Sequence, residues 1–326
     1  MFAYVIPRAE ADVVQASVSK EHLVYRVDKS EEVILLSKTP ITSLHKYPVI
    51  HNNHPFILVS RALRREPTSI QVRNAIIGGD SYFSVIAGPC AVESEEQLVA
   101  IANVLSRWGV VLMRGGAFKP RTSPYSFQGL GEEGLRMFRE VADAHGMAVV
   151  SELLDLSLLE VVYPYVDVIQ VGSRNMFNYQ MLKVLGQVDK PILLKRGMYA
   201  TVEEWLLAAE YILLHGNEQV ILCERGIRSF DPYFRNILDF NAVALLRELS
   251  HLPVWVDPSQ GSGRRDIILP LAKAAQTIGA HGVMVEIHPT PDVALSDGFQ
   301  SLTLDEFEVM MQQLKTTTST LVKAQD

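Results

Sequence analysis

Cysteine is scarce in this chain. Cys90 and Cys223 are the only two among 326 residues, too few for a disulfide framework, so a reducing compartment is expected. Long apolar runs are also missing, because no window reaches the roughly 20 residues that a membrane-spanning helix needs. The apolar start, Met1–Ile6, lacks the basic lead-in of a secretion signal and is followed at once by Pro7. These absences predict a cytoplasmic protein with no membrane partner.

Positive charge is in deficit as well. The sequence has 30 Lys and Arg against 37 Asp and Glu, a net charge of −7, so its overall charge does not predict binding to nucleic acid or to an anionic membrane. Apolar residues make up 48% and charged residues 21% of the chain, which is typical of a soluble globular protein with a sizeable core. We expect the function to come from a local site.

Eight short apolar runs recur between residues 83 and 286, and almost every one ends at residues able to hold an anion or a metal ion. The runs are Phe83–Ala87, Val110–Met113, Ala148–Val150, Val168–Val171, Ile192–Leu194, Val220–Leu222, Val254–Val256 and Val283–Val285. Segments with helical periodicity lie between them, such as Glu95–Trp108 after a predicted cap at Ser94. This alternation predicts an α/β fold, a (β/α)8 or TIM barrel over residues 68–326. Functional groups of such barrels lie at the C-terminal ends of the strands.

Residues 1–67 read differently and predict a separate small α+β module. Short strands are expected at Phe2–Ile6, Leu23–Val27, Val33–Leu36 and Phe56–Ser60, and short helices at Ala9–Ser17 and Ile41–Tyr47. The segment Arg61–Ser69 reads as a polar linker to the barrel. At the other end of the chain, a last helix is expected from Leu304 to about Leu321, and Cys223 is expected to be a core residue.

The segment Arg114–Ser123 carries the densest chemistry. Its sequence, Arg-Gly-Gly-Ala-Phe-Lys-Pro-Arg-Thr-Ser, holds three cations and two hydroxyls directly after a predicted strand. Arginine offers a planar fork to a carboxylate or phosphate, and lysine a compact point charge. Further cations follow other strands: Arg174, Lys195 with Arg196, and Arg225. Together these side chains predict a cage around a small, highly anionic substrate.

Arg264 and Arg265 leave two interpretations open. They follow the seventh predicted strand, in the region where barrels often bind phosphate. The alternative is an ordinary helix start in which they pair with Asp266.

A metal site is also predicted, from Cys90, Glu286 and Asp297. A soft thiolate combined with carboxylates suits a divalent transition ion such as Mn, Fe, Co or Zn. His288 lies two residues from Glu286 and is either a bystander near this site or a structural histidine.

At these residues the sequence closely resembles the 3-deoxy-D-arabino-heptulosonate 7-phosphate (DAHP) synthases of the short type I branch. That branch also contains the 3-deoxy-D-manno-octulosonate 8-phosphate synthases. The resemblance covers residues 82 to about 314 and rests on the motifs Ala87–Glu93, Arg114–Gly129, Gln170–Asn175, Leu194–Gly197, Cys223–Gly226, Asp257–Ser259 with Gly263–Arg265, and Leu295–Gly298. The segment Lys119-Pro-Arg-Thr122 favours the heptulosonate enzymes, because the octulosonate enzymes carry an Asn-Arg-Ser type segment there.

The resemblance implies an aldol-like condensation of phosphoenolpyruvate (PEP) with erythrose 4-phosphate, the entry step of the shikimate pathway. It assigns PEP binding to Arg114, Lys119, Arg174, Lys195 and Arg225, and erythrose 4-phosphate binding to Arg121, Thr122, Ser123 and Ser173. It assigns a divalent ion to Cys90, Glu286 and Asp297. Lys119 is the expected proton carrier, supported by Glu152 or Asp257, so that the catalytic set is Lys119, Cys90, Glu152 and Asp257.

One position departs from the family pattern. The family places a metal-binding histidine after Asp-Pro-Ser, and this chain has Gln260 there. An amide oxygen is a weaker donor than imidazole for transition metals and does not titrate near neutral pH. Three readings follow: Gln260 binds an ion such as Mn or Mg through its oxygen, the ion is held by the other three ligands and water, or the original reaction has been lost or changed. We favour a working enzyme.

The resemblance also bears on partners and regulation. Relatives are usually homotetramers or homodimers, and some carry a ferredoxin-like domain that senses tyrosine or phenylalanine. Residues 1–67 occupy the place of that domain, so an aromatic amino acid effector or a role in assembly is expected. Two alternatives to DAHP synthesis remain at this level: a PEP-dependent synthase that uses another aldose phosphate, and a non-catalytic relative that keeps the anion cage.

Overall fold

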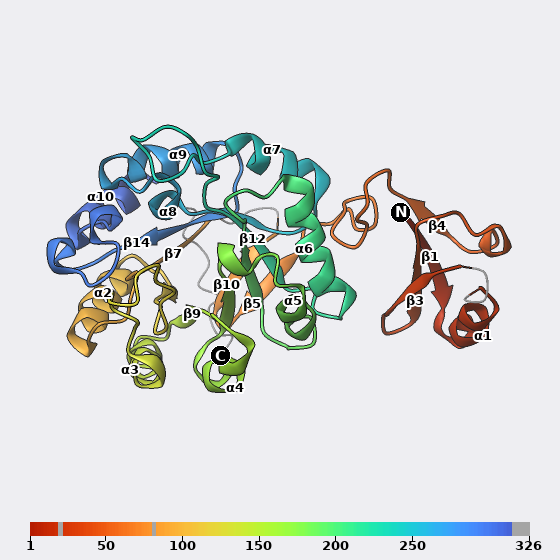
Figure 1. Cartoon of the computed structure of the whole chain (residues 1–326), viewed down its shortest axis with the longest axis horizontal. Coiled ribbons are helices and arrows are strands. Elements are labelled where there is room, and N and C mark those ends of the chain that lie inside the picture. The colour runs from red at the N-terminus through yellow and green to blue at the C-terminus, as the bar shows by residue number, and fades with distance from the viewer. Residues whose placement is uncertain (19–21, 80–82, 315–326) are drawn as a thin grey trace, which may run out of the picture.

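The computed structural model describes residues 1–18, 22–79 and 83–314. It contains a closed parallel barrel and a small antiparallel sheet that stands to one side of it (Figure 1). The predicted α/β fold class, a (β/α)8 barrel with a small N-terminal α+β module, is therefore confirmed. None of the helices in these described ranges is long and apolar enough to cross a membrane.

The N-terminal module is a four-stranded antiparallel sheet with one helix. Its elements are β1 (Phe2–Pro7), α1 (Arg8–Val18), β2 (Val24–Asp28), β3 (Glu32–Ser37) and β4 (Val49–His51). The strand order β2-β3-β1-β4 is that of a ferredoxin-like fold. The helix expected at Ile41–Tyr47 is reduced to a single 3₁₀ turn, Thr42–Leu44, and the sequence reading missed β4. One face of the sheet packs on α1 through Tyr4, Ile6 and Leu35.

The predicted strand at Phe56–Ser60 is wrong. These residues form an irregular segment between module and barrel, and the backbone donors of Ile57, Leu58 and Val59 are satisfied by a side chain instead of a neighbouring strand. All three N–H groups donate to the carboxylate of Glu210, at 2.9, 2.9 and 3.0 Å. Burial raises the pKa of Glu210 against the opposing effect of these three donors.

A β-hairpin precedes the barrel and was not predicted. Strands β5 (Ser69–Val72) and β6 (Ala75–Gly78) pair with each other. Their apolar side chains, including Ile70 and Ile77, pack with interior barrel residues such as Trp255. The hairpin is amphipathic only over four-residue strands, so its sequence pattern is too short to separate it from a linker. It covers the barrel interior on the side opposite the polar strand ends.

The barrel is closed by parallel pairing of eight strands. They are β7 (Ser84–Gly88), β8 (Leu112–Arg114), β9 (Ala148–Glu152), β10 (Val168–Val171), β11 (Ile192–Lys195), β12 (Val220–Glu224), β13 (Val254–Val256) and β14 (Gly282–Glu286). Pairing of β14 with β7 closes the ring. The strands coincide with the eight predicted apolar runs to within two residues at each end. Cys223 is fully buried in the barrel interior, as predicted.

Helices surround the strands in the order that the sequence requires (Figure 1). They are α2 (Glu95–Arg107), α3 (Gly131–Ala144), α4 (Leu159–Val162), α5 (Tyr179–Leu185), α6 (Val202–Leu214), α7 (Phe240–Leu249), α9 (Ile268–Thr277) and α10 (Leu304–Gln313), with a short α8 (Pro258–Ser262) after β13. Ser94 caps α2 as predicted, by accepting a hydrogen bond from the Gln97 N–H. The predicted continuation of α10 to Leu321 lies outside the described residues.

Candidate active site

A cavity of about 420 Å³ opens at the C-terminal ends of the barrel strands. Its lining contains seven cationic side chains and two carboxylates, Glu152 and Asp297. The cations are Lys119, Arg121, Arg174, Lys195, Arg225, Arg228 and Arg235. A concave site with this excess of positive charge attracts small anions and stabilises negative charge on them. Of the cations predicted for the cage, Lys119, Arg121, Arg174, Lys195 and Arg225 line this cavity. Arg114 lies outside the lining, and Arg196 is buried in ion pairs with Glu224 and Asp239 instead.

Two glycines allow the strand ends to approach one another. A Cβ atom on Gly172 would lie 2.0 Å from Glu152 Oε1, and one on Gly88 would lie 1.9 Å from the carbonyl oxygen of Arg114. Gly88 also has a φ of 155°. Any larger residue would push Glu152 or Arg114 out of position. Gly172 therefore lets Glu152 lie against the end of β10. Gly88 lets the backbone of Arg114 lie close to the loop that carries Cys90.

A buried ion pair anchors one cation of the cavity lining. Lys195 Nζ lies 2.5 Å from Asp257 Oδ2, and both side chains are almost fully buried. Asp257 also caps α8, because its Oδ1 accepts from the Gln260 N–H at 2.9 Å. Burial opposes ionisation of Asp257, but Lys195, Arg114 and the cap bond outweigh it and lower its pKa. The carboxylate therefore stays charged and fixes Lys195 at the edge of the cavity.

Gln260 faces the cationic cage. Its side-chain oxygen accepts from Lys195 Nζ at 3.2 Å and from Arg225 Nη2 at 3.5 Å. Burial lowers the pKa of Arg225, and its Nε is buried without a hydrogen-bond partner among the described residues. A buried donor without a partner is costly. Arg225 is therefore well suited to receive an anionic ligand.

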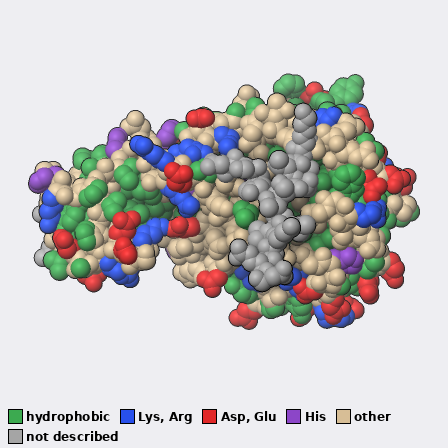
Figure 2. Space-filling view, turned by 180° about the vertical axis from the view of Figure 1, so that it is seen from behind, with side chains coloured by type: hydrophobic (Ala, Val, Ile, Leu, Met, Phe, Trp, Pro, Cys, Tyr) green, Lys and Arg blue, Asp and Glu red, His purple; other side chains and the backbone are tan. Residues whose placement is uncertain are grey.

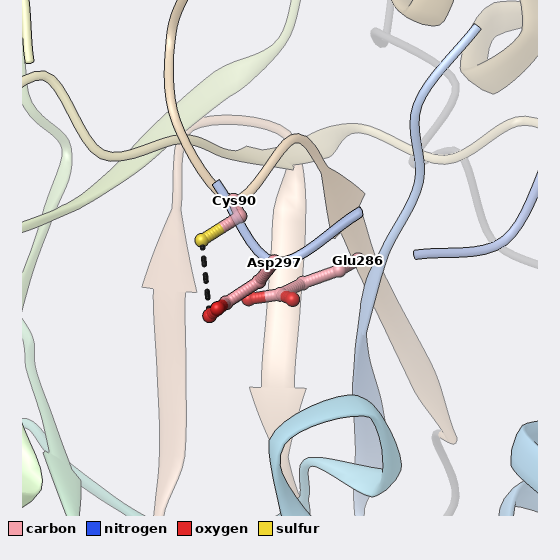
Figure 3. A group of neighbouring side chains, drawn as sticks. All are labelled: Cys90, Glu286 and Asp297. Atoms are coloured by element: carbon pink, nitrogen blue, oxygen red, sulfur yellow. Dashed lines mark hydrogen bonds between the residues drawn. The ribbon is translucent and has the colours of Figure 1, made fainter. Parts of the chain in front are cut away.

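Three candidate metal ligands meet at the floor of the site. The ligand atoms of Cys90, Glu286 and Asp297 all lie within 4.8 Å of one another, and Figure 3 shows the three side chains turned toward each other. The Sγ of Cys90 is 3.5 Å from Asp297 Oδ2. One thiolate and two carboxylates are a donor set that suits a divalent transition ion. The residues present therefore fit the ion that was predicted here.

Each of these three ligands also contacts a cation of the chain. Lys119 Nζ lies 3.1 Å from Cys90 Sγ, Arg114 Nη1 lies 3.0 Å from Glu286 Oε1, and Arg235 Nη1 lies 3.2 Å from Asp297 Oδ2. Burial, with the nearby Glu286, raises the pKa of the Cys90 thiol to about 11 despite Lys119. The Asp297 carboxyl behaves oppositely: burial opposes its ionisation, but Arg235 outweighs this and lowers its pKa.

The predicted site residues fall into two groups, those that line the cavity and those buried beside it. Lys119, Arg121, Thr122, Ser123, Glu152, Ser173, Arg174, Lys195, Arg225, Gln260 and Asp297 line the cavity. Arg114, Cys90, Asp257 and Glu286 lie buried near it and outside its lining. Arg174 is exposed and makes no hydrogen bond or ion pair within the described part of the chain.

Other candidate residues lie away from the cavity lining. Arg264 pairs with Asp266 at 2.7 Å, and Arg265 donates to the Gly298 carbonyl. For Arg264, the structure therefore agrees with the second interpretation, an arginine that pairs with Asp266 at a helix start. The Nε2 of His288 lies 3.3 Å from a Glu93 oxygen, which is a contact outside the metal group.

Sequence reasoning missed several residues of the site. Arg228 and Arg235 line the cavity from the loop between β12 and α7, and Gln300 binds Glu286 Oε2 at 2.6 Å through its Nε2. Ser296 bridges Arg121 Nη1, at 2.5 Å, and Cys90 Sγ, at 3.2 Å. None of these follows a strand directly, so strand-end position gave no signal. The β12–α7 segment Arg225–Arg235 does carry three arginines within eleven residues, which could have suggested a second basic loop.

The fold and the cavity define a (β/α)8-barrel site for anionic substrates beside a candidate divalent-metal centre. Comparison with known proteins gives the family. Residues 60–323 match the DAHP synthetase I family, and the chain belongs to this family.

Individual relatives support this assignment. The chain is 53% identical over 261 residues to a phospho-2-dehydro-3-deoxyheptonate aldolase of Thermotoga maritima, covering 80% of this chain and 77% of that protein. It is 30% identical to a 2-dehydro-3-deoxyphosphooctonate aldolase of Syntrophotalea carbinolica, covering 76% and 95%. The crystal structure of the Thermotoga maritima DAHP synthase superposes with a TM-score of 0.80 at 44% identity, over 96% of both chains.

Proposed function

We propose that this protein is a DAHP synthase, a transferase that condenses PEP with erythrose 4-phosphate and water to give DAHP and phosphate. The observation that carries the proposal is the cation-rich cavity, with Lys119-Pro-Arg-Thr122 in its wall, in a chain 53% identical to a heptonate aldolase. This segment favours a four-carbon aldose phosphate over the longer acceptors of octulosonate synthases. The reaction is the first step of the shikimate pathway.

PEP binds near the buried Lys195 and Arg225 in this proposal. These two side chains and the exposed Arg174 supply charge for its phosphate and carboxylate, and the unpartnered Nε of Arg225 supports this role. Arg114 contributes from below, where its charge is shared with Glu286. Lys195 is held by Asp257, so it presents its charge without having to be ordered on binding.

We assign erythrose 4-phosphate to a second set of lining residues. Arg121, Thr122, Ser123 and Ser173 are all at least partly exposed and offer one cation and three hydroxyls. PEP and erythrose 4-phosphate each carry a phosphate, and the two sets give each phosphate its own donors. The aldehyde carbon of erythrose 4-phosphate would then point inward, toward Lys119 and Cys90.

The chemical step joins C3 of PEP to the aldehyde carbon, while water adds to C2 and phosphate leaves. Lys119 is the proposed proton carrier, because its Nζ reaches the floor of the site, 2.8 Å from the Cys90 carbonyl and 3.1 Å from its sulfur. Glu152 lines the same cavity and is held by Gln170 at 3.1 Å. Glu152 and Asp257 support Lys119 by keeping the surrounding charges in place.

Cys90, Glu286 and Asp297 would hold a divalent ion, one of Mn, Fe, Co, Zn or Mg. When bound, such an ion polarises the aldehyde oxygen or activates the attacking water. Gln260 has its oxygen on Lys195 and Arg225, so of the three readings of this residue we favour the one in which the other three ligands and water complete the metal site. Its amide then orders two cations of the PEP cage.

The test is turnover by chelator-stripped protein with each ion added back singly. We expect loss of PEP with erythrose 4-phosphate to return with at least one ion, and little turnover with arabinose 5-phosphate. Arg225→Gln should abolish PEP binding, whereas Arg264→Gln, whose parent side chain pairs with Asp266 outside the cavity, should leave it unchanged. Folded protein that binds PEP but turns over neither aldose phosphate would refute the proposal.

We further propose that the protein is cytoplasmic, assembles as a homotetramer or homodimer, and responds to an aromatic amino acid through its N-terminal module. The ferredoxin-like strand order of that module and its attachment to α6 through Glu210 support the last point. Light scattering of the full chain tests the assembly. Activity measured with added tyrosine or phenylalanine tests the effector, and unchanged activity with both would exclude it.

A further inference from the structure

Each residue of the metal group, Cys90, Glu286 and Asp297, has a neighbouring cation. These three cations differ in how exposed they are. Arg114, beside Glu286, has a side chain only 5% exposed. Lys119, beside Cys90, is also tied to the Cys90 carbonyl at 2.8 Å. As whole residues, Arg114 and Lys119 are 4% and 9% exposed, so neither has much room to change position.

Arg235, beside Asp297, is different. Its side chain is 37% exposed, it lines the cavity, and it comes from the loop that connects β12 to α7. Its Nη1 contacts Asp297 Oδ2 at 3.2 Å and Gln300 Oε1 at 2.8 Å. Among the three counter-cations it is the most exposed, and it therefore has the most room to change position.

Gln300 ties this contact to the rest of the metal group. It is fully buried, and its Nε2 donates to Glu286 Oε2 at 2.6 Å while its Oε1 accepts from Arg235. One amide therefore connects the counter-cation of Asp297 with the second carboxylate ligand. Loss or gain of the contact between Arg235 and Gln300 would thus be felt at Glu286 as well as at Asp297.

We propose that Arg235 is an exchangeable counter-cation: it neutralises Asp297 in the metal-free protein and turns to an anion in the cavity when a divalent ion takes Asp297. This inference rests on the metal site of the proposed function. A guanidinium and a divalent ion are both drawn to the same carboxylate and repel each other, so Arg235 lowers the affinity of the empty site for metal.

The place to which Arg235 would move couples metal binding to phosphate binding. The cavity already contains Arg121, Arg228 and Arg225, so a guanidinium released into it meets like charges. A phosphate group there reverses that repulsion and gives Arg235 a charge-assisted partner. Metal and phosphate therefore each favour the other, and by linkage each must raise the affinity of the other by the same factor.

The experiment measures Mn²⁺ binding to chelator-stripped full-length protein by electron paramagnetic resonance, with and without inorganic phosphate below the level that precipitates manganese. The wild type should bind Mn²⁺ more tightly when phosphate is present, by roughly 5-fold or more, the lower end of typical coupling between sites. Arg235→Gln should bind Mn²⁺ more tightly than the wild type without phosphate, and phosphate should then add little. Arg235→Lys, which keeps the charge, should retain part of the coupling.

Arg264→Gln is the matched control. Arg264 is a partly exposed arginine outside the cavity lining, and its Nη2 pairs with Asp266 Oδ2 at 2.7 Å instead of with the metal group. This variant should keep the phosphate effect on Mn²⁺ affinity. Equal Mn²⁺ affinity and equal phosphate effect in the wild type and Arg235→Gln would overturn the inference, and so would weaker Mn²⁺ binding by Arg235→Gln. Absence of Mn²⁺ binding by the folded wild type would instead remove the metal site itself, and the inference with it.

Discussion

Replacing Lys195 by Met is expected to cost about 3–5 kcal/mol of folding stability at neutral pH, the usual cost of breaking a buried ion pair by removing one partner. Lys195 Nζ lies 2.5 Å from Asp257 Oδ2, and the two side chains are 1% and 0% exposed. Methionine keeps much of the apolar stem of lysine, so cavity formation contributes little. The expected loss comes from leaving the Asp257 carboxylate buried without its principal counter-charge.

The size of this loss should depend on pH. In the wild type the pKa of Asp257 is lowered, so its contribution to stability is present above the pKa of an unfolded aspartate, about 3.9, and is lost only as pH falls through the lower folded value. Lys195 is the largest of the effects that lower this pKa, so without it we expect burial to outweigh Arg114 and the cap bond and to raise the folded pKa above the unfolded one. The variant then loses stability as pH rises from about 4 toward that folded value. The two proteins should differ most at neutral pH and least near pH 4–5.

Thermal unfolding at pH 8 and pH 5 measures this difference. At roughly 2 °C per kcal/mol for a chain of this size, the variant should melt about 6–10 °C below the wild type at pH 8, with a smaller gap at pH 5. Lys195→Met/Asp257→Asn is the control, because it removes both charges and keeps the oxygen that caps α8 through the Gln260 N–H. The double variant should recover most of the stability. A pH-independent gap, or no recovery in the double variant, would refute the reasoning.

Three further changes have defined outcomes. Gln260→His should tighten Mn²⁺ binding roughly tenfold, because an imidazole would add a strong donor to three ligands that otherwise rely on water; an unchanged dissociation constant would show that a histidine at this position does not reach the ion. Glu210→Gln should destabilise the protein by about 1–3 kcal/mol, because an amide nitrogen cannot accept from the Val59 N–H and leaves that buried donor unpaired; Glu203→Gln, exposed on the same helix, should be neutral in urea unfolding. Burial lowers the pKa of His251 from 6.5 to about 4, so its contribution to stability should be lost as pH falls between these values, and this decline should be smaller in His251→Gln when melting temperatures are compared from pH 7 to pH 4.

The barrel could be predicted because each strand has a local signal. A parallel strand buried on both faces reads as a short apolar run, and the polar residues that follow must lie at the same end of the barrel. Lys195 and Glu286 were found in this way. The same reasoning could not find Arg235 or Gln300, which reach the metal group from long loops. Their positions depend on packing between segments more than 60 residues apart in sequence, as the Arg235–Gln300 contact shows.

The error at Phe56–Ser60 has a different cause. Its apolar residues are buried, as a strand pattern predicts, with Phe56, Ile57 and Val59 almost fully inaccessible. What a strand also needs is a partner for its backbone, and the partner here is the carboxylate of Glu210, more than 150 residues away. Periodicity reports burial and says nothing of which group satisfies the N–H donors.

The attachment formed by this segment is polar on several sides. The ring of His251 contacts the Leu58 carbonyl at 2.7 Å and the Thr68 hydroxyl at 2.6 Å. Nearby, Lys29 of the module pairs with Glu218 of the barrel. Figure 2 shows side chains of both charge signs gathered where the module meets the barrel. Hydrogen bonds depend on direction as well as distance, so these contacts define how the module is attached to the barrel.

Charge is distributed differently in the metal group and in the cavity, and Gln260 belongs to the cavity lining. The metal group pairs each anion with one cation, Cys90 with Lys119, Glu286 with Arg114 and Asp297 with Arg235. The cavity lining has cations in excess. The amide of Gln260 adds no charge to this lining, but its oxygen accepts from both Lys195 and Arg225. An imidazole that turned to a metal ion would give up that contact. Glutamine in place of the family's histidine therefore weakens the metal site but orders two cations of the anion cage. Gln260→His should accordingly bind Mn²⁺ more tightly and PEP more weakly than the wild type.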